Sequence, residues 1–247
     1  MTKFLAMAYS LVCYAIGVAA LVYLILFTAD LFVPATVNTP SPFAPALHGP
    51  AAIGWNIALV AAWGAQHTFM ASPGFKAWWT KIVPAPIERS TYLVFVALMT
   101  AALAAFWAPV EGIYYDLSGT MAGNVVLGIF FLGWVITLIA TFLINHFHLF
   151  GLQQAYHLIA KTQSKSATFK TPLFYKLVRH PMMTGILIAL WAAPTLSVNR
   201  LVFNLAMTAY IFIGIFFEEK TLVRDLGDKY IDYKRTTPSV IPGLHRG

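Results

Sequence analysis

Charged and imidazole side chains border the apolar runs of this sequence, where they are costly and therefore mark candidate functional sites. Arg179-His180-Pro181 precedes one apolar run, and Glu218-Glu219 directly follows another. Two adjacent carboxylates at the end of an apolar helix would oppose the helix dipole and repel each other. We therefore expect the acidic pair to have a positive partner, either Arg179 or a bound cation. Taken alone, the Arg-His-Pro triplet also fits a positively charged membrane anchor followed by a helix-starting proline.

Histidines form the second set of candidates. His67 lies near the end of the second apolar run, and His146 and His148 follow Asn145 at the end of the fourth. A neutral imidazole can accept a proton, although a lone His at a membrane edge is more often a packing residue. We rank His146 slightly ahead of His67 as a general base, because Asn145 and His148 adjoin it and could orient its ring.

The same histidines could also supply imidazole ligands to a metal ion. His146 and His148 are two residues apart and point to different faces of a helix, whereas His pairs that share a helix face usually lie four apart. We therefore predict no metal, with His67 and these two residues as the ligands if one binds.

The apolar runs are long enough to be membrane helices. Of the 247 residues, 59% are hydrophobic and 10% are charged, whereas a soluble protein would have about 25% charged residues. Crossing a hydrocarbon core takes about 20 helical residues. We predict an all-α polytopic membrane helix bundle of five to six membrane segments, including a short C-terminal helical hairpin, followed by an amphipathic cytoplasmic tail. The predicted segments are Phe4–Ala29, Pro50–Phe75, Ser90–Val110, Leu117–Asn145, Pro181–Asn199 and Leu201–Phe217.

The positive charges predict the orientation in the membrane. With six crossings, every Lys and Arg except Arg200 lies in segments on one side, and positive charge collects on the cytoplasmic side. We therefore predict a multi-pass protein of a bacterial-type cytoplasmic membrane with both termini in the cytoplasm. A re-entrant final pair of helices would leave the same segments inside. Topology explains the net charge of +7, so we predict the lipid bilayer as a partner, no nucleic acid and no obligate protein partner.

The polar segments between the runs are short. We expect Thr36–Pro50, which contains four prolines, to be an ordered outer loop, and Gln154–Lys170 to be a cytoplasmic connector. After Phe217, apolar and aromatic residues recur at helical spacing, which favours a surface helix. The only cysteine, Cys13, lies within the first run, so no intramolecular disulfide is possible.

The two charged motifs together resemble a known family. The segment "VRHPMMTG", a short apolar hairpin, and then "EEKTLVRDLGDKYIDYKR" with "VIP" are similar to the isoprenylcysteine carboxyl methyltransferase superfamily. The match covers about Tyr175–Pro242, with Met183 where that family commonly has Tyr and Leu226 where it has Phe. The resemblance implies that these motifs form a pocket for S-adenosylmethionine. The implied cofactor-binding residues are Tyr175, Leu177, Val178, Arg179, His180, Pro181, Met183, Gly185, Glu218 and Glu219.

Upstream motifs resemble one branch of that superfamily. "PIERSTY" and "NHFHLFGLQQ" are similar to the methanethiol S-methyltransferase branch, although His148 stands where an acidic residue is expected. This resemblance implies methylation of a small apolar thiol, methanethiol to dimethyl sulfide, with His146, His67, Asn145 and His148 as catalytic candidates. A prenylated cysteine carboxylate or a lipid is the alternative acceptor, and a non-catalytic denitrification-associated membrane protein is the alternative class. We expect one methyltransferase domain over residues 1–247, with four transmembrane helices in 1–145 and the cofactor-binding part, hairpin and tail in 146–247.

Overall fold

The computed structural model describes residues 3–160, 162 and 169–244. The chain forms two compact units. Unit 1 comprises Met1–Glu111 and Asn145–Thr168, and unit 2 comprises Gly112–Ile144 and Phe169–Gly247. The predicted all-α membrane bundle is confirmed, because helices make up nearly all of the regular structure in the described residues.

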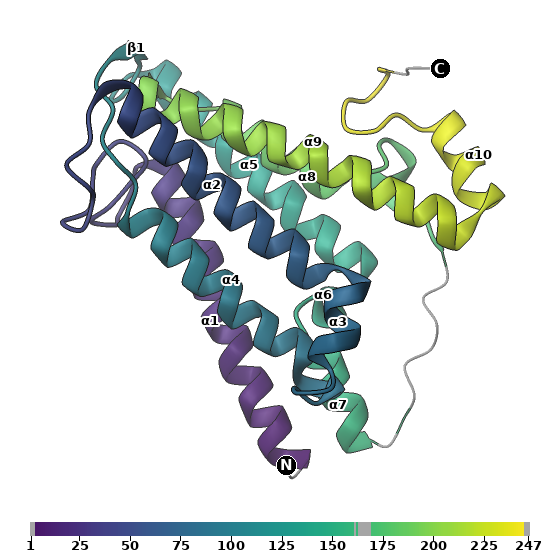
Figure 1. Ribbon diagram of the computed structural model, residues 1–247. Helices are drawn as coiled ribbons and strands as arrows, with labels where there is room; N and C mark the ends of the chain where they lie inside the picture. The colour runs from purple at the N-terminus through teal and green to yellow at the C-terminus, as the bar shows by residue number, and fades with distance from the viewer. Residues whose placement is uncertain (1–2, 161, 163–168, 245–247) are drawn as a thin grey trace. The chain divides into compact units, whose positions relative to one another are not determined.

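Unit 1 is built on three long helices that lie side by side (Figure 1). The first, α1 (Lys3–Ala29), packs along α4 (Ala85–Ala105), and α4 also contacts α2 (Gly49–Ala71). Small residues lie between α1 and α4: the Ser90 hydroxyl donates to Ser10 Oγ at 2.9 Å, and a Cβ added at Gly17 would meet the Leu93 side chain at 3.4 Å. The short helices of this unit are α3 (Pro73–Trp79), α6 (His146–Leu149) and α7 (Leu152–Ala160).

The predicted second run is two helices rather than one. Helix α2 ends at Ala71, and Ser72 accepts a hydrogen bond from the Phe75 amide at 3.3 Å as the N-cap of α3. Pro73 occupies the first turn of α3, where its missing N–H costs nothing. A Ser-Pro pair therefore interrupts an apolar run that contains no charge.

The loop between α1 and α2 is ordered, as predicted for Thr36–Pro50. The Asn38 side-chain Nδ2 donates to Asp30 Oδ2 at 2.7 Å, and the Trp107 indole N–H donates to the Val37 carbonyl at 3.2 Å. The connector predicted at Gln154–Lys170 begins within α7, and residues 161 and 163–168 of it lie outside the described residues.

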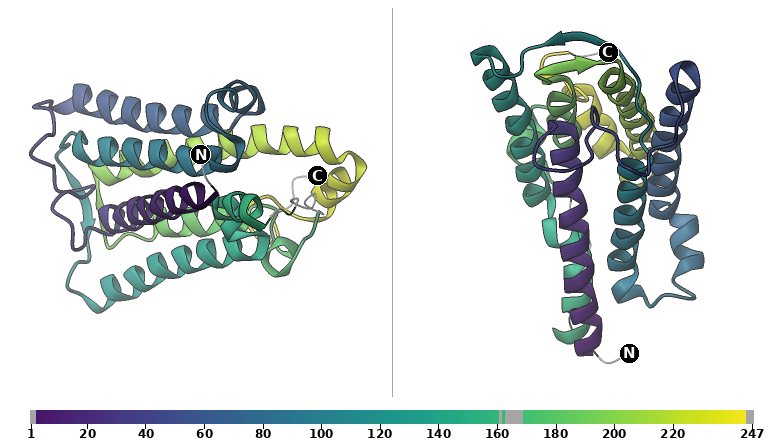
Figure 2. Two further views of the ribbon diagram at one scale, coloured as in Figure 1. Left: turned by 90° about the horizontal axis from the view of Figure 1, so that it is seen from below. Right: turned by 90° about the vertical axis from the view of Figure 1, so that its left-hand side faces the viewer.

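Unit 2 contains α5 (Met121–Ile144), α8 (Pro181–Trp191), α9 (Val198–Leu226), α10 (Asp228–Thr236) and the 3₁₀ helix η1 (Leu173–Lys176). Helices α5 and α8 pack closely (Figure 2). A Cβ added at Gly133 would lie 2.5 Å from the Gly185 carbonyl oxygen, so the backbones meet where neither residue has a side chain. Strands β1 (Ile113–Asp116) and β2 (Thr195–Ser197) form an antiparallel pair that the sequence analysis did not predict.

The expectation that Glu218-Glu219 lies at the end of a helix is wrong. Helix α9 runs unbroken through Glu218-Glu219 to Leu226, and Gly227, at a φ of 58°, ends it. The acidic pair therefore does not lie at a helix C-terminus. The physical reason is that Lys220–Leu226 contains good helix formers and no Gly or Pro, so the helix continues beyond its apolar part.

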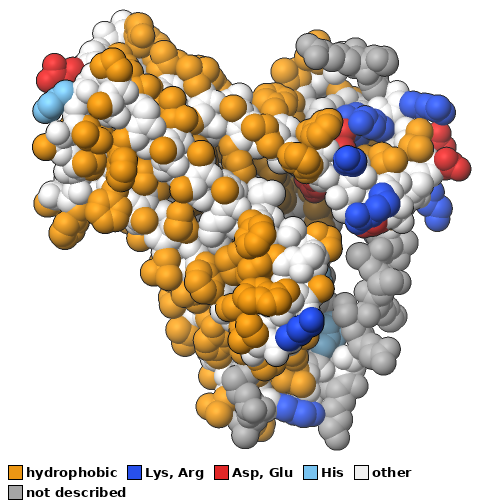
Figure 3. Space-filling model, in the orientation of Figure 1, with side chains coloured by type: hydrophobic (Ala, Val, Ile, Leu, Met, Phe, Trp, Pro, Cys, Tyr) orange, Lys and Arg blue, Asp and Glu red, His pale blue; other side chains and the backbone are white. Residues whose placement is uncertain are grey.

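Four of the described helices are long and apolar enough to cross a membrane: α1, α4, α5 and α9. Helix α8 is apolar but has only 11 residues, and α2 is long enough at 23 residues but less apolar. On the face shown in Figure 3, hydrophobic side chains cover most of the helical surface. Lys and Arg side chains gather there over α10, which contains the exposed residues Lys229, Lys234 and Arg235.

Candidate active site

A cluster of charged side chains in unit 2 contains both predicted motifs. Both the Nε and the Nη2 of Arg179 lie 2.7 Å from Glu219 Oε1, and the Lys234 ammonium lies 2.8 Å from Glu219 Oε2. His180 Nε2 is 3.1 Å from Glu219 Oε1. The expectation that the acidic pair has Arg179 as a positive partner is confirmed. We call Arg179, His180, Glu218, Glu219 and Lys234 the charged cluster.

The charged cluster fastens the C-terminal segment to the start of α8. Arg179 Nη1 donates to the carbonyls of Thr237 and Lys234. The backbone amides of Arg179 and His180 donate to the carbonyls of Pro238 and Ser239 at 2.9 and 3.0 Å. Sequence reasoning missed this attachment, because no local pattern indicates that residues 237–240 return to residues 179–180.

Glu218 and Glu219 have different surroundings. The Glu219 side chain is 9% exposed, whereas that of Glu218 is 52% exposed and lies 3.5 Å from His180 Nδ1. Successive helical residues point about 100° apart, so adjacent carboxylates face different environments. Glu219 is therefore the buried carboxylate with several positive neighbours, and Glu218 is the exposed one.

The other predicted cofactor residues also include both buried and exposed side chains. Tyr175, Val178, Pro181 and Gly185 are buried, and Gly185 lies at the close contact between α8 and α5. Leu177 is exposed, and Met183 is partly exposed. The buried residues therefore fix the backbone of this segment, and Leu177 and Met183 present apolar surface.

Ionisable groups around the charged cluster have shifted pKa values. Burial by itself would lower the pKa of His180, but its hydrogen bonds to Glu218 and Glu219 outweigh burial and raise that pKa. Burial raises the pKa of Tyr233 to about 12 and also raises the pKa of Tyr230. The imidazole is thus favoured in its charged form, and both phenols stay neutral.

His146 lies in unit 1 among aromatic rings. It is buried, its Nε2 is 3.0 Å from the Tyr14 hydroxyl, and its ring stacks on Phe150 at a centroid distance of 4.6 Å. Burial lowers the pKa of His146, which favours the neutral imidazole. Sequence reasoning missed Tyr14, because 132 positions separate it from His146.

Asn145 and His148 form the cap of the short helix α6. Asn145 Oδ1 accepts a hydrogen bond from the His148 amide at 3.1 Å, and its Nδ2 donates to Gln153 at 2.6 Å. Burial lowers the pKa of His148, and the nearby Arg89 charge lowers it further. These residues hold the turn that carries His146, while Tyr14 and Phe150 contact its ring.

His67 has a second aromatic environment in unit 1. Its ring stacks on Trp63 at a centroid distance of 5.1 Å and meets Tyr92 at 5.4 Å. The Arg89 guanidinium lies 5.0 Å from the centre of the Tyr92 ring. Nδ1 of His67 is buried and makes no hydrogen bond within the described part of the chain.

Comparison with known proteins decides the family. The chain is 38% identical over 236 residues to Methanethiol S-methyltransferase 2 of Bradyrhizobium diazoefficiens, covering 96% of this chain and 89% of the relative. It is 37% identical over 249 residues to Methanethiol S-methyltransferase of Mycobacterium tuberculosis, covering 100% of this chain and 99% of the relative. The chain belongs to the methanethiol S-methyltransferase family.

Weaker similarity extends beyond this family. Nurim of Sus scrofa is 27% identical over 168 residues, which cover 64% of this chain and 63% of that protein. No family model matches the chain, and no solved structure matches it. Membership of the methanethiol S-methyltransferase family makes the protein a methyltransferase, and its apolar helices make it a multi-pass membrane protein.

A methyltransferase requires a methyl donor, and one carboxylate of the charged cluster, that of Glu218, is more than half exposed. Leu177, two residues before Arg179, is exposed and offers apolar surface. The Tyr230 hydroxyl is buried and makes no hydrogen bond within the described part of the chain. Arg179 itself is 8% exposed and already donates to protein acceptors.

No group of three His, Cys, Asp or Glu side chains suited to a metal ion occurs among the described residues. The three histidines named as possible ligands lie in unit 1, where His146 pairs with Tyr14 and His67 packs between aromatic rings.

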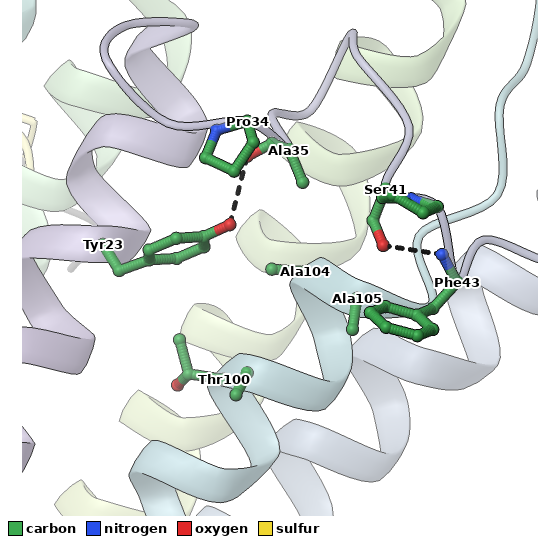
Figure 4. Close-up of a pocket in the computed structure, with 10 residues that line it drawn as sticks. Tyr23, Pro34, Ala35, Ser41, Phe43, Thr100, Ala104 and Ala105 are labelled. Atoms are coloured by element: carbon green, nitrogen blue, oxygen red, sulfur yellow. Dashed lines mark hydrogen bonds between the residues drawn. The ribbon is translucent and has the colours of Figure 1, made fainter.

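A cavity of about 280 Å³ in unit 1 contains none of the predicted site residues. Figure 4 shows that Tyr23 of α1 and Thr100 of α4 flank it, beneath the loop that follows α1. The Tyr23 hydroxyl donates to Ala35 and the Ser41 hydroxyl accepts from Phe43, so these polar groups are already hydrogen-bonded. The lining residues are Tyr23, Pro34, Ala35, Ser41, Pro42, Phe43, Thr100, Ala101, Ala104 and Ala105.

Proposed function

We propose that the protein transfers the methyl group of S-adenosylmethionine to a small thiol, methanethiol, which becomes dimethyl sulfide. The observation that carries the proposal is the similarity of almost the whole chain to several methanethiol S-methyltransferases, at 36–38% identity. When bound, S-adenosylmethionine supplies a methyl group on a positively charged sulfur, ready for displacement by a nucleophile.

The charged cluster supports the cofactor part of the proposal. We assign Glu218 to the positive groups of the cofactor, because its carboxylate is the exposed member of the acidic pair. Leu177 and Met183 would contact apolar parts of the cofactor, since apolar side chains line most ligand sites. Arg179, His180 and Glu219, with Tyr175, Val178, Pro181 and Gly185 around them, hold the backbone in place for this role.

The acceptor must lose a proton before it can attack. The thiolate is the nucleophilic form, and an alkyl thiol is mostly protonated near neutral pH. His146 and His67 are the proposed proton acceptors, and the lowered pKa of His146 favours its neutral, accepting form. Asn145 and His148 support His146 by capping α6.

The membrane setting suits this acceptor. A small, apolar, volatile thiol can dissolve in the bilayer and reach a buried base without crossing an open water channel. The charge distribution supports a bacterial-type cytoplasmic membrane with both termini in the cytoplasm, because every Lys and Arg except Arg200 lies in segments assigned to that side.

Headspace analysis of bacterial cells tests the proposal. Cells that express the chain and receive methanethiol are expected to release dimethyl sulfide, and cells with the empty vector are not. Equal dimethyl sulfide from both cultures would reject methanethiol as the acceptor. Label from methyl-labelled methionine appearing in membrane lipid instead would indicate a lipid acceptor.

A further inference from the structure

The surroundings of His67 differ from those of His146 in one respect that bears on catalysis. His146 already holds the Tyr14 hydroxyl at Nε2, at 3.0 Å. His67 is packed by rings, yet its Nδ1 is buried with no hydrogen-bond partner among the described residues. A buried polar atom without a partner is costly, and a catalytic role or a bound molecule is among the reasons a protein keeps one.

We infer that Trp63, His67 and Tyr92 form the binding site for the acceptor thiol, with His67 Nδ1 receiving the thiol proton. We call these three residues the thiol site. The inference rests on the proposed function and names the residues at which its acceptor binds. All three belong to unit 1, on α2 and α4.

The chemistry of the thiol site matches a small thiol. Sulfur makes favourable contacts with aromatic rings, and the thiol S–H is a weak donor that pairs with an imidazole nitrogen. With the ring proton on Nε2, the lone pair of Nδ1 accepts the thiol proton as the S–H bond breaks. The bonding electrons stay on sulfur as the thiolate, and the imidazolium later returns its proton to solvent. Bulk water does not reach Nδ1 in this structure, whereas a small apolar molecule pays little to enter an apolar site.

Contacts outside the thiol site hold its rings in place. The Trp63 indole N–H donates to Thr100 Oγ1 at 3.1 Å, and the Tyr92 hydroxyl donates to the His67 carbonyl at 3.3 Å. Arg89 lies over the Tyr92 ring and donates from Nε to the Leu149 carbonyl at 2.8 Å. Trp63 and Tyr92 are buried, so neighbouring side chains pack around both rings and leave little room for a long ligand. Such a site favours a one-carbon thiol over longer ones.

Binding is measured first, without the cofactor. The full-length protein is labelled with ¹⁵N-histidine in detergent micelles, and the ring nitrogens of His67 and His146 are assigned with His67→Gln and His146→Gln. Methanethiol is then titrated in. We expect the His67 signals to shift in a saturable way, while the His146 signals change at least about threefold less. Trp63→Phe keeps a ring in place and should weaken binding about two- to fivefold.

Turnover is measured on the same proteins. We expect His67→Gln to lower turnover at least about tenfold, with partial recovery at higher pH, because general-base assistance is typically worth about 10²–10⁴-fold. Trp63→Leu should raise the ratio of ethanethiol to methanethiol turnover at least about threefold. The matched control is Trp55→Phe on the same helix, whose indole N–H donates to the Phe106 carbonyl at 2.8 Å. It should leave both binding and thiol preference unchanged.

The outcomes separate the inference from the proposed function. If wild-type protein methylates methanethiol but the His67 signals do not respond and Trp63→Leu keeps the wild-type preference, the thiol site is wrong and the function stands. If the His67 signals respond but no thiol is methylated, the proposed function fails while a thiol-binding site remains. If Trp63→Leu does not fold, the thiol site is tested with the other two variants. Unchanged methanethiol binding in Trp63→Phe, or unchanged turnover in His67→Gln, would then reject it.

Discussion

The Arg179 guanidinium and the Glu219 carboxylate lie 2.7 Å apart, and both side chains are almost fully buried. This ion pair connects the segment before α8 with the later part of α9, while Arg179 also donates to the carbonyl of Thr237. A buried guanidinium without its partner is costly. The pair therefore holds together the segments from which a cofactor site would be built.

Removal of one partner should destabilise the protein. Arg179→Ala leaves a buried carboxylate less compensated and frees the C-terminal segment, so we expect a loss of about 3–5 kcal/mol in the free energy of unfolding. Denaturant unfolding in detergent measures it. The control is Arg224→Ala, which removes an exposed pair with Asp225 and should change the free energy of unfolding very little. Equal effects of the two variants would contradict the structural role of Arg179.

Substitution of Glu218 should affect the cofactor and spare the fold. Glu218 is 52% exposed, so Glu218→Gln should leave unfolding nearly unchanged. Loss of a charged hydrogen bond would weaken S-adenosylmethionine binding by about 1.5–3 kcal/mol. Calorimetric titration measures the affinity, and Asp225→Asn, at an exposed residue on the same helix, is the control. Unchanged affinity in Glu218→Gln would remove Glu218 from the proposed cofactor site.

The raised pKa of His180 predicts a pH dependence of stability. A group whose pKa is higher in the folded protein binds its proton more tightly there, so it stabilises the fold fully below its unfolded pKa, about 6.5. That contribution should be lost as pH rises from there through the folded pKa. Unfolding measured across this range should show stability falling with pH, and His180→Gln should flatten this part of the curve. The same slope in wild type and variant would assign it to another group.

Loss of a base should lower the rate and spare cofactor binding. We expect His146→Ala or His67→Ala to reduce turnover at least about tenfold, with little change in S-adenosylmethionine affinity. Raising the pH should partly rescue the defective variant, because more of the thiol arrives already ionised. Initial rates over a pH series provide the measurement. Full activity of both variants at every pH would mean that the thiol ionises in solution before it binds.

The long apolar helices could be predicted because their signal is local. Helices α1 and α5 begin and end within a few residues of the predicted runs, since long uncharged stretches leave little choice of structure in a bilayer. The extent of α9 was missed because the predicted span ended with the apolar run at Phe217, while helix propensity carries the helix to Gly227. Strands β1 and β2 are too short to give a periodic pattern.

The contacts of the candidate site could be predicted only in part. The adjacent carboxylates predicted a positive partner, either Arg179 or a bound cation, and the structure pairs Glu219 with Arg179. The hydrogen bond between Tyr14 and His146 joins residues 132 positions apart, and nothing local in either segment indicates it. The roles of the predicted cofactor and catalytic residues stay predictions.

Methyl transfer by the purified protein tests the central claim most directly. The protein in detergent is given S-adenosylmethionine labelled in its methyl group together with methanethiol, and the volatile product is collected. The account predicts labelled dimethyl sulfide, formed in equal amount to S-adenosylhomocysteine and absent when either reactant is omitted. Cofactor turnover without labelled dimethyl sulfide, or no turnover by a folded protein, would contradict it.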